Sequence, residues 1–372
     1  MLISAGLVVT SARAVAPGWV LVEGDRIADV QEGLPPRPPD LELPNATIVP
    51  GYVDAHVHGG GGASFDDGDE GAATVACAHL GHGTTTITAS LVTDDAASLE
   101  RSVRELAELA KDGLVAGIHL EGPWLSPRQA GAHDPNLLSE PTPRRVESFV
   151  DAAGGHLRMV TLAPELPGGL DTIRRLDAAG VVAAIGHTDA TYDIASAALD
   201  AGATVGTHLF NAMRGLHHRE PGPVAALLEH PHAYVELIAD GVHLHPAVLR
   251  LAATRKPGRA VLVTDAMAAA GAGDGDYALG TMAVEVRDGV ARLADTGLIA
   301  GSTLTMAAAV KFAVQVAGLP LEDVVRAATA SPAAMLGLDR VGSLCPGFRA
   351  DLVVLDGDLN VLRVLHRGQW VR

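Results

Sequence analysis

Aromatic residues and cysteines are scarce in this chain of 372 residues. Only 3% of the residues are Phe, Trp or Tyr although 48% are hydrophobic, so the apolar weight falls on Ala, Val and Leu. Such side chains suit closely packed helices around a Val/Ile-rich sheet. The only two cysteines, Cys77 and Cys345, lie far apart, which excludes a disulfide framework and a thiolate zinc site and fits a reducing cytoplasm. We expect Cys77 to be a buried packing residue.

Positive charge is also scarce. The chain has 27 Lys and Arg against 44 Asp and Glu, a formal net charge of −17 without any run of Lys or Arg, which opposes binding to nucleic acid or to an anionic membrane. No uninterrupted apolar run approaches the ~18 residues of a membrane span. Residues 1–16 are fairly apolar but begin without a basic residue, so we expect no export signal. These absences favour a cytoplasmic protein that acts on a small molecule.

The middle of the chain alternates between two patterns. Short apolar runs rich in β-branched residues occur at 48–56, 84–92, 115–120, 157–162, 181–185, 204–209, 235–239 and 260–263. Stretches with helical signals separate many of them, at 97–110, 170–179, 194–201, 224–230 and 247–254, and a last helix is expected at about 304–317. Eight such units with polar residues at nearly every strand end favour a closed (β/α)8 TIM-type barrel over an open sheet.

Other segments do not follow this alternation. Residues 7–10, 19–23 and 26–30, and later 351–355 and 361–366, are expected to be short strands with turns between them. Because chain ends are often close in space, we expect residues 1–48 and 341–372 to form a small β-sandwich domain beside a barrel of residues 49–340. Within the barrel, an Asp-Gly turn between two alternating stretches predicts an inserted hairpin at about 271–298.

Histidines and carboxylates gather at the predicted strand ends. The first barrel strand ends in His56-Val57-His58, whose two imidazoles share one face because side chains two apart in a strand point the same way. Four further strand ends carry side chains of the same chemical kind, namely His119 with Glu121, His187, His208 and Asp265. In a barrel of this type the C-terminal mouth collects catalytic groups, and imidazole with carboxylate suits Zn, Fe and similar ions. The sequence therefore predicts a metal site there.

Not every histidine belongs to this pattern. His119 is in phase with Glu121 and is expected to be a neighbour of the ligands more often than a ligand itself. Six other histidines lie outside the motifs, namely His79, His82, His156, His230, His232 and His366. We expect them to be polar surface residues or hydrogen-bonded core residues.

Several strings together resemble one family. The strings His119-Leu120-Glu121-Gly122-Pro123 and His208-Leu209-Phe210-Asn211-Ala212-Met213 resemble motifs of the N-acetylglucosamine-6-phosphate deacetylases of the amidohydrolase superfamily. The strings Gly131-Ala132-His133, Gly186-His187-Thr188, Asp240-Gly241-Val242-His243 and Thr264-Asp265-Ala266-Met267 follow the same order, from about residue 50 to about residue 340.

This resemblance implies roles for individual residues. It implies a divalent metal held by Glu121, His187 and His208, with His56 and His58 available for a second ion that Glu121 would bridge. Asp265, which also counts among the ligand-type side chains, would be the general base. His133, Asn211, Ala212, Arg219 and His243 would contact an amino-sugar phosphate. Arg219 would do so in its own subunit or in a neighbouring one, and the second case would make the active protein a homodimer.

Elementary chemistry agrees with these roles. A bound metal lowers the pKa of its water from 15.7 towards ~7, and a carboxylate such as that of Asp265 can take up the proton and pass it to the departing amine. Zn is the expected ion, with Fe, Mn or Co as alternatives for the same ligand set. The segment His217-His218-Arg219 is the one dense cationic group near the mouth, and a guanidinium binds phosphate bidentately.

Other functions remain open at this point. Another amidohydrolase, such as a cyclic amidase or a D-aminoacylase, would share the barrel and the His-x-His pair. Cyclic amidases of this kind typically bridge two metals with a carboxylated lysine, but the only lysines, Lys111, Lys256 and Lys311, do not occupy a predicted inward strand end. A sugar-phosphate sensor without catalysis would have no need of Asp265. Neither the epimer of the sugar nor the number of metal ions follows from the sequence.

Overall fold

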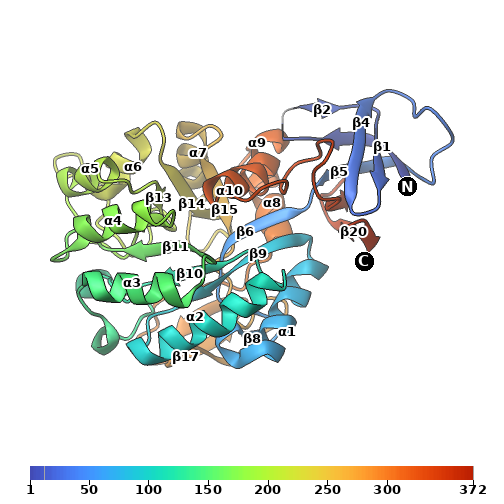
Figure 1. Cartoon of the computed structure of the whole chain (residues 1–372). Helices are drawn as coiled ribbons and strands as arrows, with labels where there is room; N and C mark the ends of the chain where they lie inside the picture. The colour runs from blue at the N-terminus through green and yellow to red at the C-terminus, as the bar shows by residue number, and fades with distance from the viewer. Residues whose placement is uncertain (12, 372) are drawn as a thin grey trace.

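The structure is a computed structural model that describes residues 1–11 and 13–371. At its centre lies a sheet of eight parallel strands, and neighbours in the sheet follow one another in the chain (Figure 1). The strands are β6 (Tyr52–Val57), β9 (Thr84–Leu91), β10 (Ile118–Glu121), β11 (Leu157–Leu162), β12 (Val182–Ile185), β13 (Val205–Gly206), β14 (Tyr234–Ile238) and β15 (Ala260–Val263). The first and last strands meet where the Ala266 carbonyl accepts the His58 N–H at 2.8 Å. This arrangement confirms the predicted barrel.

Helices surround the sheet. They are α1 (Gly68–Gly81), α2 (Ala96–Lys111), α3 (Pro143–Ala152), α4 (Gly169–Ala178), α5 (Tyr192–Asp200), α6 (Gly222–Glu229), α7 (Pro246–Arg255), α8 (Met306–Gln315), α9 (Leu321–Ala327) and α10 (Ala330–Met335). Side chains that accept hydrogen bonds from the first turn fix several helix starts, such as Asp95 before α2 and Thr305 before α8. Cys77 is exposed on α1, so the expectation that it is buried is wrong.

The two ends of the chain form one continuous mixed sheet, at the upper right of Figure 1. It runs in the order β21-β20-β19-β5-β1-β3-β4, with β2 beside β1. The strands are β1 (Leu2–Val9), β2 (Ala14–Val15), β3 (Gly18–Glu23), β4 (Arg26–Glu32), β5 (Leu41–Pro50), β19 (Leu352–Leu355), β20 (Val361–His366) and β21 (Gln369–Trp370). This end sheet has an apolar core of its own, which includes Ile3, Val20, Ile48 and Leu352.

The predicted first barrel strand, 48–56, is wrong at its N-terminal end. Residues 48–50 belong to β5, where Val49 pairs with Val353 of the end sheet, and the barrel strand β6 begins only at Tyr52. Gly51 separates the two strands, and a Cβ atom at this position would overlap the Thr85 side chain. The apolar run is continuous across the boundary, so hydrophobicity alone does not mark it.

The predicted insertion has one strand more than expected. It is a three-stranded antiparallel sheet of β16 (Gly275–Leu279), β17 (Met282–Arg287) and β18 (Val290–Leu293), whereas the sequence pattern indicated only the last two. The short pair β7 (Gly59–Gly60) and β8 (Ala63–Ser64) and the 3-10 turns η1 (Phe65–Asp67), η2 (Pro127–Gln129) and η3 (Pro135–Leu137) lie in the loops. Among the described residues, no helix combines the length and the apolar character needed to cross a membrane.

Candidate metal centre and substrate cavity

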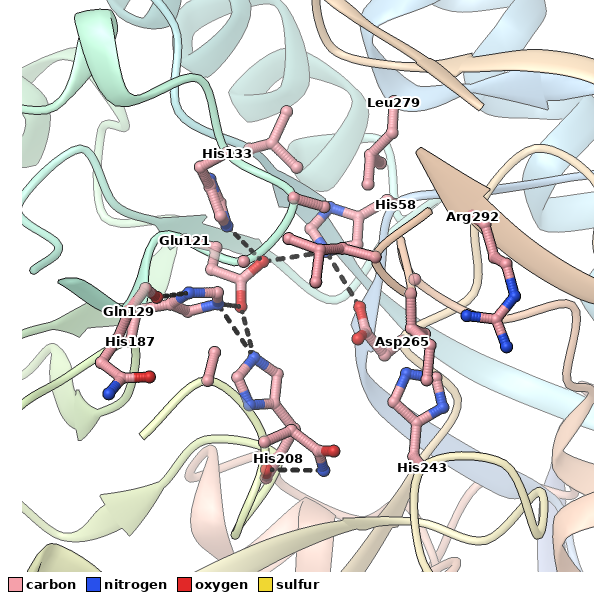
Figure 2. A pocket seen from close by; sticks show the side chains of 18 of the residues that line it. His58, Glu121, Gln129, His133, His187, His208, His243, Asp265, Leu279 and Arg292 are labelled. Carbon is pink, nitrogen blue, oxygen red and sulfur yellow. Dashed lines mark hydrogen bonds and ion pairs between the residues drawn. The ribbon is translucent and has the colours of Figure 1, made fainter. Parts of the chain in front are cut away.

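Six predicted ligand side chains meet at the C-terminal ends of the barrel strands. They come from five strand ends, are all buried, and are His56, His58, Glu121, His187, His208 and Asp265. Figure 2 labels five of them, with His58, His187 and His208 turned toward the Glu121 carboxylate and Asp265 beside His58; His56 is not labelled in it. The convergence follows from the parallel topology, because the carboxyl ends of all eight strands lie at one edge of the barrel.

One group of ligand-type atoms lies around one oxygen of Glu121. Its Oε2 is 3.5 Å from His56 Nε2 and 3.2 Å from His58 Nε2. Asp265 Oδ1 lies 3.4 Å and 3.2 Å from the same two nitrogens. The four residues each place a ligand atom within 4.8 Å of the others, so they could hold one ion.

A second group lies around the other oxygen of the same carboxylate. Glu121 Oε1 is 3.1 Å from His187 Nε2 and 2.9 Å from His208 Nε2, and these two nitrogens are 3.1 Å apart. Glu121 therefore presents one oxygen to each group of imidazoles. A carboxylate in this position can bridge two cations.

Three of the four candidate ligand histidines have a backbone or carboxylate oxygen at Nδ1, which turns Nε2 toward the centre of the cluster. His56 Nδ1 lies 3.1 Å from Glu236 Oε2, His58 Nδ1 lies 3.2 Å from the Ser90 carbonyl, and His187 Nδ1 lies 2.9 Å from the Gln129 carbonyl. Since these oxygens can only accept, each Nδ1 carries the hydrogen, and in the neutral ring each Nε2 carries a lone pair. Lone pairs that face a carboxylate at about 3 Å need a cation between them, so the residues present fit a metal.

The electrostatics of the cluster favour positive charge. Burial raises the pKa of Glu121, but His56 and then His187 outweigh that effect and hold the pKa well below its usual value. Asp265 behaves in the same way. Burial raises its pKa, but His56 lowers the pKa by more than burial raises it, so the net shift is downward. The cluster thus holds its carboxylates ionised and attracts cations.

His133 contacts the cluster in a different tautomer. The Thr93 N–H donates to His133 Nδ1 at 3.2 Å, so the hydrogen of this ring sits on Nε2 and faces Glu121 Oε2 at 3.4 Å. Burial lowers the pKa of His133 to about 4, which keeps the ring neutral. Although His133, Glu121 and His187 lie close enough to hold an ion, this tautomer makes His133 a hydrogen-bond donor.

His119 is fully buried beneath the ligands. Its two nitrogens lie 2.9 Å from Ser90 Oγ and 2.9 Å from Thr161 Oγ1, and its ring packs edge-on against His56 with centroids 4.5 Å apart. Both nitrogens are therefore engaged by hydroxyl groups. The structure therefore places His119 beside His56, with both of its nitrogens turned to hydroxyl groups of the barrel.

Three of the six residues have left-handed backbone conformations. The φ angles are 46° at His187, 27° at His208 and 50° at Asp265. Such angles are uncommon for residues other than glycine, and they cluster at functional sites where the surrounding structure compensates the strain. All three follow a barrel strand within two residues, so the turn after the strand directs each side chain into the mouth.

A cavity of about 540 Å³ opens above the cluster. The ligand-type side chains form its floor, and the loop after β10 and the inserted sheet form its walls (Figure 2). The lining includes four of the five residues predicted to contact substrate, namely His133, Asn211, Ala212 and His243. His243 Nδ1 lies 2.6 Å from Asp240 Oδ2, and although burial lowers the pKa of His243, this hydrogen bond raises it overall.

The fifth predicted contact, Arg219, lies elsewhere. It is exposed in the loop before α6, where its Nη1 is 2.8 Å from His218 Nε2, and it lines a separate hollow together with Tyr192 and Glu220. The structure of a single chain therefore does not bring Arg219 to the cavity. Two other guanidinium groups, Arg128 and Arg292, do line the cavity, and sequence reasoning missed both. Arg128 pairs with Asp189 at 3.0 Å.

Sequence reasoning also missed Glu236, the carboxylate that contacts His56. A signal was present, because Glu236 is the one charged residue in the apolar run 235–239. A charged residue in a barrel strand that is buried on both faces needs a partner.

Comparisons with known proteins agree with this geometry. Residues 47–371 match the model of the amidohydrolase family. The chain is 42% identical over 361 residues to N-acetylgalactosamine-6-phosphate deacetylase of Escherichia coli O157:H7, with 95% of each chain covered. It is 37% identical over 355 residues to N-acetylglucosamine-6-phosphate deacetylase of Vibrio furnissii, with 94% of this chain and 86% of the relative covered.

A solved structure is similar along the whole chain. It is an aspartate-to-alanine mutant of N-acetyl-D-glucosamine-6-phosphate deacetylase from Mycobacterium smegmatis in complex with N-acetyl-D-glucosamine 6-phosphate. The two chains are 50% identical, with a TM-score of 0.98 over 100% of this chain and 99% of the other. The N-acetylglucosamine-6-phosphate deacetylase from Thermotoga maritima is 31% identical, with a TM-score of 0.91 over 100% of this chain and 99% of that one.

Proposed function

Because the chain belongs to the amidohydrolase family, we propose that it hydrolyses the N-acetyl group of N-acetylglucosamine 6-phosphate. The products are glucosamine 6-phosphate and acetate, in amino-sugar catabolism. The observation that carries the proposal is the buried histidine and carboxylate cluster on the floor of a cavity large enough for a small ligand. Relatives with this activity in their names match nearly the whole chain, which supports the choice of substrate.

In this proposal the cluster holds one or two divalent ions, with Zn first and Fe, Mn or Co as alternatives. Glu121, His187 and His208 would hold one ion, and His56 and His58 would hold a second, with Asp265 beside them. When bound, a divalent cation supplies Lewis acidity, which lowers the pKa of a water and polarises an amide carbonyl. The inward lone pairs of the histidines support this assignment.

Asp265 is the proposed general base. Its carboxylate lies in the cavity lining and its pKa is below the usual value, so it is ionised and able to accept a proton from the attacking water. The protonated Asp265 carboxyl then returns this proton to the amide nitrogen as the C–N bond breaks, and the amine departs neutral. His243, with its raised pKa beside Asp240, is placed to donate to the carbonyl oxygen as negative charge develops there.

The remaining proposed roles concern the sugar phosphate. Asn211, Ala212 and His133 line the cavity and contact the sugar, with the Nε2–H of His133 as a donor. Arg219 binds the phosphate group of the substrate that lies in the cavity of a neighbouring subunit, which makes the active protein a homodimer. Arg219 is exposed, and so is Leu216, three residues earlier in the same loop, with 53% of its surface exposed; both support a role at a subunit interface. We also place the protein in the cytoplasm, in keeping with its two free cysteines.

A second substrate has a specific observation in its favour. The relative from Escherichia coli O157:H7, at 42% identity, is named for N-acetylgalactosamine 6-phosphate. The two sugars differ at one hydroxyl, so a cavity of this kind could accept either. We place the glucosamine compound first because the Mycobacterium smegmatis structure, which is 50% identical to this chain, holds N-acetyl-D-glucosamine 6-phosphate.

The test is an acetate-release assay on three compounds: N-acetylglucosamine 6-phosphate, N-acetylgalactosamine 6-phosphate and unphosphorylated N-acetylglucosamine. We expect the largest kcat/KM for the first compound and a value lower by tenfold or more, roughly, for the sugar without phosphate. A larger kcat/KM on the galactosamine compound would favour the second substrate. If none of the three compounds releases acetate, the proposed function is refuted.

A further inference from the structure

Glu236 is a buried carboxylate that no step of the proposed mechanism uses. It lies in the middle of β14 with none of its surface exposed, among the apolar residues Tyr234, Val235, Leu237 and Ile238. Within the described part of the chain, no Arg or Lys forms an ion pair with it, and its Oε1 atom has no hydrogen-bond partner. An isolated carboxylate in such surroundings is strongly unfavourable unless a positive charge compensates it.

The other oxygen of this carboxylate makes two contacts. Glu236 Oε2 lies 3.1 Å from His56 Nδ1 and accepts the backbone N–H of His208 at 3.3 Å. His56 belongs to the group of ligands on one oxygen of Glu121, and His208 belongs to the group on the other oxygen. One oxygen atom of Glu236 therefore touches a member of each group.

The contact with His56 determines where the ring presents its lone pair. Since a carboxylate can only accept, His56 Nδ1 must carry the hydrogen, and Nε2 is left to face Glu121 and Asp265. Hydrogen bonds of this kind fix the tautomer and the orientation of metal-binding histidines and raise their basicity.

The contact with His208 supports a strained turn. The φ angle of His208 is 27°, which few residues other than glycine adopt, and the peptide before it donates to the Glu236 side chain. The next residue, Leu209, donates its N–H to the backbone carbonyl of Glu236 at 2.9 Å. Both the side chain and the backbone of Glu236 therefore hold the turn that directs His208 at Glu121.

We propose that Glu236 is a positioning residue that orients one ligand of each group, and that its negative charge is compensated by the bound cations. The inference rests on the metal dependence in the proposed function. It adds a residue that touches neither the substrate nor the reacting atoms, because Glu236 lies beneath the ligands and does not line the cavity.

The test compares zinc affinity in Glu236→Leu, Glu236→Gln and the unaltered protein, by competition with a chromophoric chelator. Leucine removes the acceptor and the charge, so we expect zinc to bind roughly 10- to 100-fold more weakly. Glutamine keeps an oxygen that can accept from His56 Nδ1, so we expect a smaller loss, of roughly three- to tenfold. In both variants kcat should fall while KM for the sugar phosphate changes little, because the cavity lining is unchanged.

Melting temperatures of the metal-free proteins distinguish this role from a merely structural one. Without bound cations the buried carboxylate has only the His56 ring beside it to compensate its charge, so Glu236→Gln should melt at the same temperature as the unaltered metal-free protein or higher. Val235→Ala is the matched control: it damages the buried core at the neighbouring position of the same strand, so it should lower the melting temperature and leave zinc affinity unchanged.

Zinc affinity within twofold of the unaltered protein in Glu236→Leu would overturn the inference. If that variant does not fold, the same result in Glu236→Gln overturns it. A lower melting temperature of metal-free Glu236→Gln, with unchanged zinc affinity, would show that Glu236 serves only the fold. Zinc affinity is measured without substrate, so absence of acetate release from the unaltered protein would refute the proposed function and leave this inference standing.

Discussion

In the sheet at the chain ends, the buried carboxylate of Asp351 is enclosed by its own partners. It contacts Arg349 Nε, lies 3.2 Å from His366 Nδ1 and accepts the Arg367 N–H at 2.8 Å. In the barrel sheet, which also has eight strands, the Glu121 carboxylate faces imidazole lone pairs instead. The end sheet thus satisfies its buried charge within the chain, whereas the barrel brings its buried carboxylate together with imidazole nitrogens in an arrangement that could hold a cation.

This difference separates a structural site from a functional one. The buried carboxylate of Asp351 has all its partners within the chain, so it serves the fold. A cluster of metal-ligand side chains instead has a bound cation as its partner, so it serves binding and chemistry. Changes in the barrel cluster should therefore alter turnover and metal binding, and changes in the end sheet should alter stability alone.

The largest effect is expected for Asp265→Asn. The amide cannot accept a proton, so kcat for acetate release should fall by roughly 10²- to 10⁴-fold, while the sugar phosphate still binds. Acetate release gives kcat, and calorimetric titration gives the binding constant. Turnover at the rate of the unaltered protein would show that Asp265 is not the base.

A second and smaller effect is expected for Arg219→Ala. Loss of a charged hydrogen bond to phosphate costs about 1.5–3 kcal/mol, so KM for N-acetylglucosamine 6-phosphate should rise by roughly 10- to 100-fold with kcat largely kept. The rate on the unphosphorylated sugar should not change. Arg287→Ala, which alters an exposed residue of the inserted sheet paired with Asp276, is the matched control.

The outcome for Arg219 also concerns the assembly. If Arg219→Ala leaves KM unchanged while Arg292→Ala raises it, the phosphate is bound within one subunit by the inserted sheet, and the proposed contribution from a neighbouring subunit is wrong. Sedimentation of the unaltered protein gives the oligomeric state directly.

The smallest effect is expected for Asp351→Asn in the end sheet. Breaking a buried carboxylate network of this kind should lower the free energy of unfolding at neutral pH by about 1–3 kcal/mol and leave kcat/KM unchanged. Chemical denaturation followed by circular dichroism measures the change. Asp25→Asn, at an exposed turn of the same sheet, should cost less than about 1 kcal/mol.

The cost of Asp351→Asn should depend on pH. Burial raises the pKa of Asp351, but His366 and Arg349 outweigh it and hold the pKa below its usual value. A carboxyl with a lowered pKa in the folded state contributes its stability above the pKa of the unfolded state, about 3.9, and loses it as pH falls through the folded value. The difference between the two proteins should therefore be equal at pH 7 and pH 5 and shrink below about pH 4. A difference that grows in acid would contradict this account.

The barrel and the convergence of the candidate ligand side chains could be predicted from the sequence for a clear physical reason. A strand buried on both faces is apolar until it ends, so a polar residue such as Glu121 or Asp265 marks the strand end and also the mouth. His56 and His58 were predictable because alternate residues of a strand share a face.

Other features depend on contacts between distant segments. Gly51 divides one apolar run between two sheets because the Thr85 side chain occupies the space beside it, and no local pattern shows this. The left-handed φ angles of His187 and His208 result from tertiary contacts that override residue preference. Arg219 and Arg292 illustrate the same limit, because a sequence shows that a residue is charged but not which cavity it reaches.

The most direct test of the central claim is acetate release from N-acetylglucosamine 6-phosphate by protein stripped of metal, measured as zinc is added back per subunit. We expect stripped protein to be nearly inactive, activity to rise with bound zinc to a plateau at one or two ions, and the bound ions to raise the melting temperature. Full activity in protein shown by elemental analysis to contain no metal would contradict it.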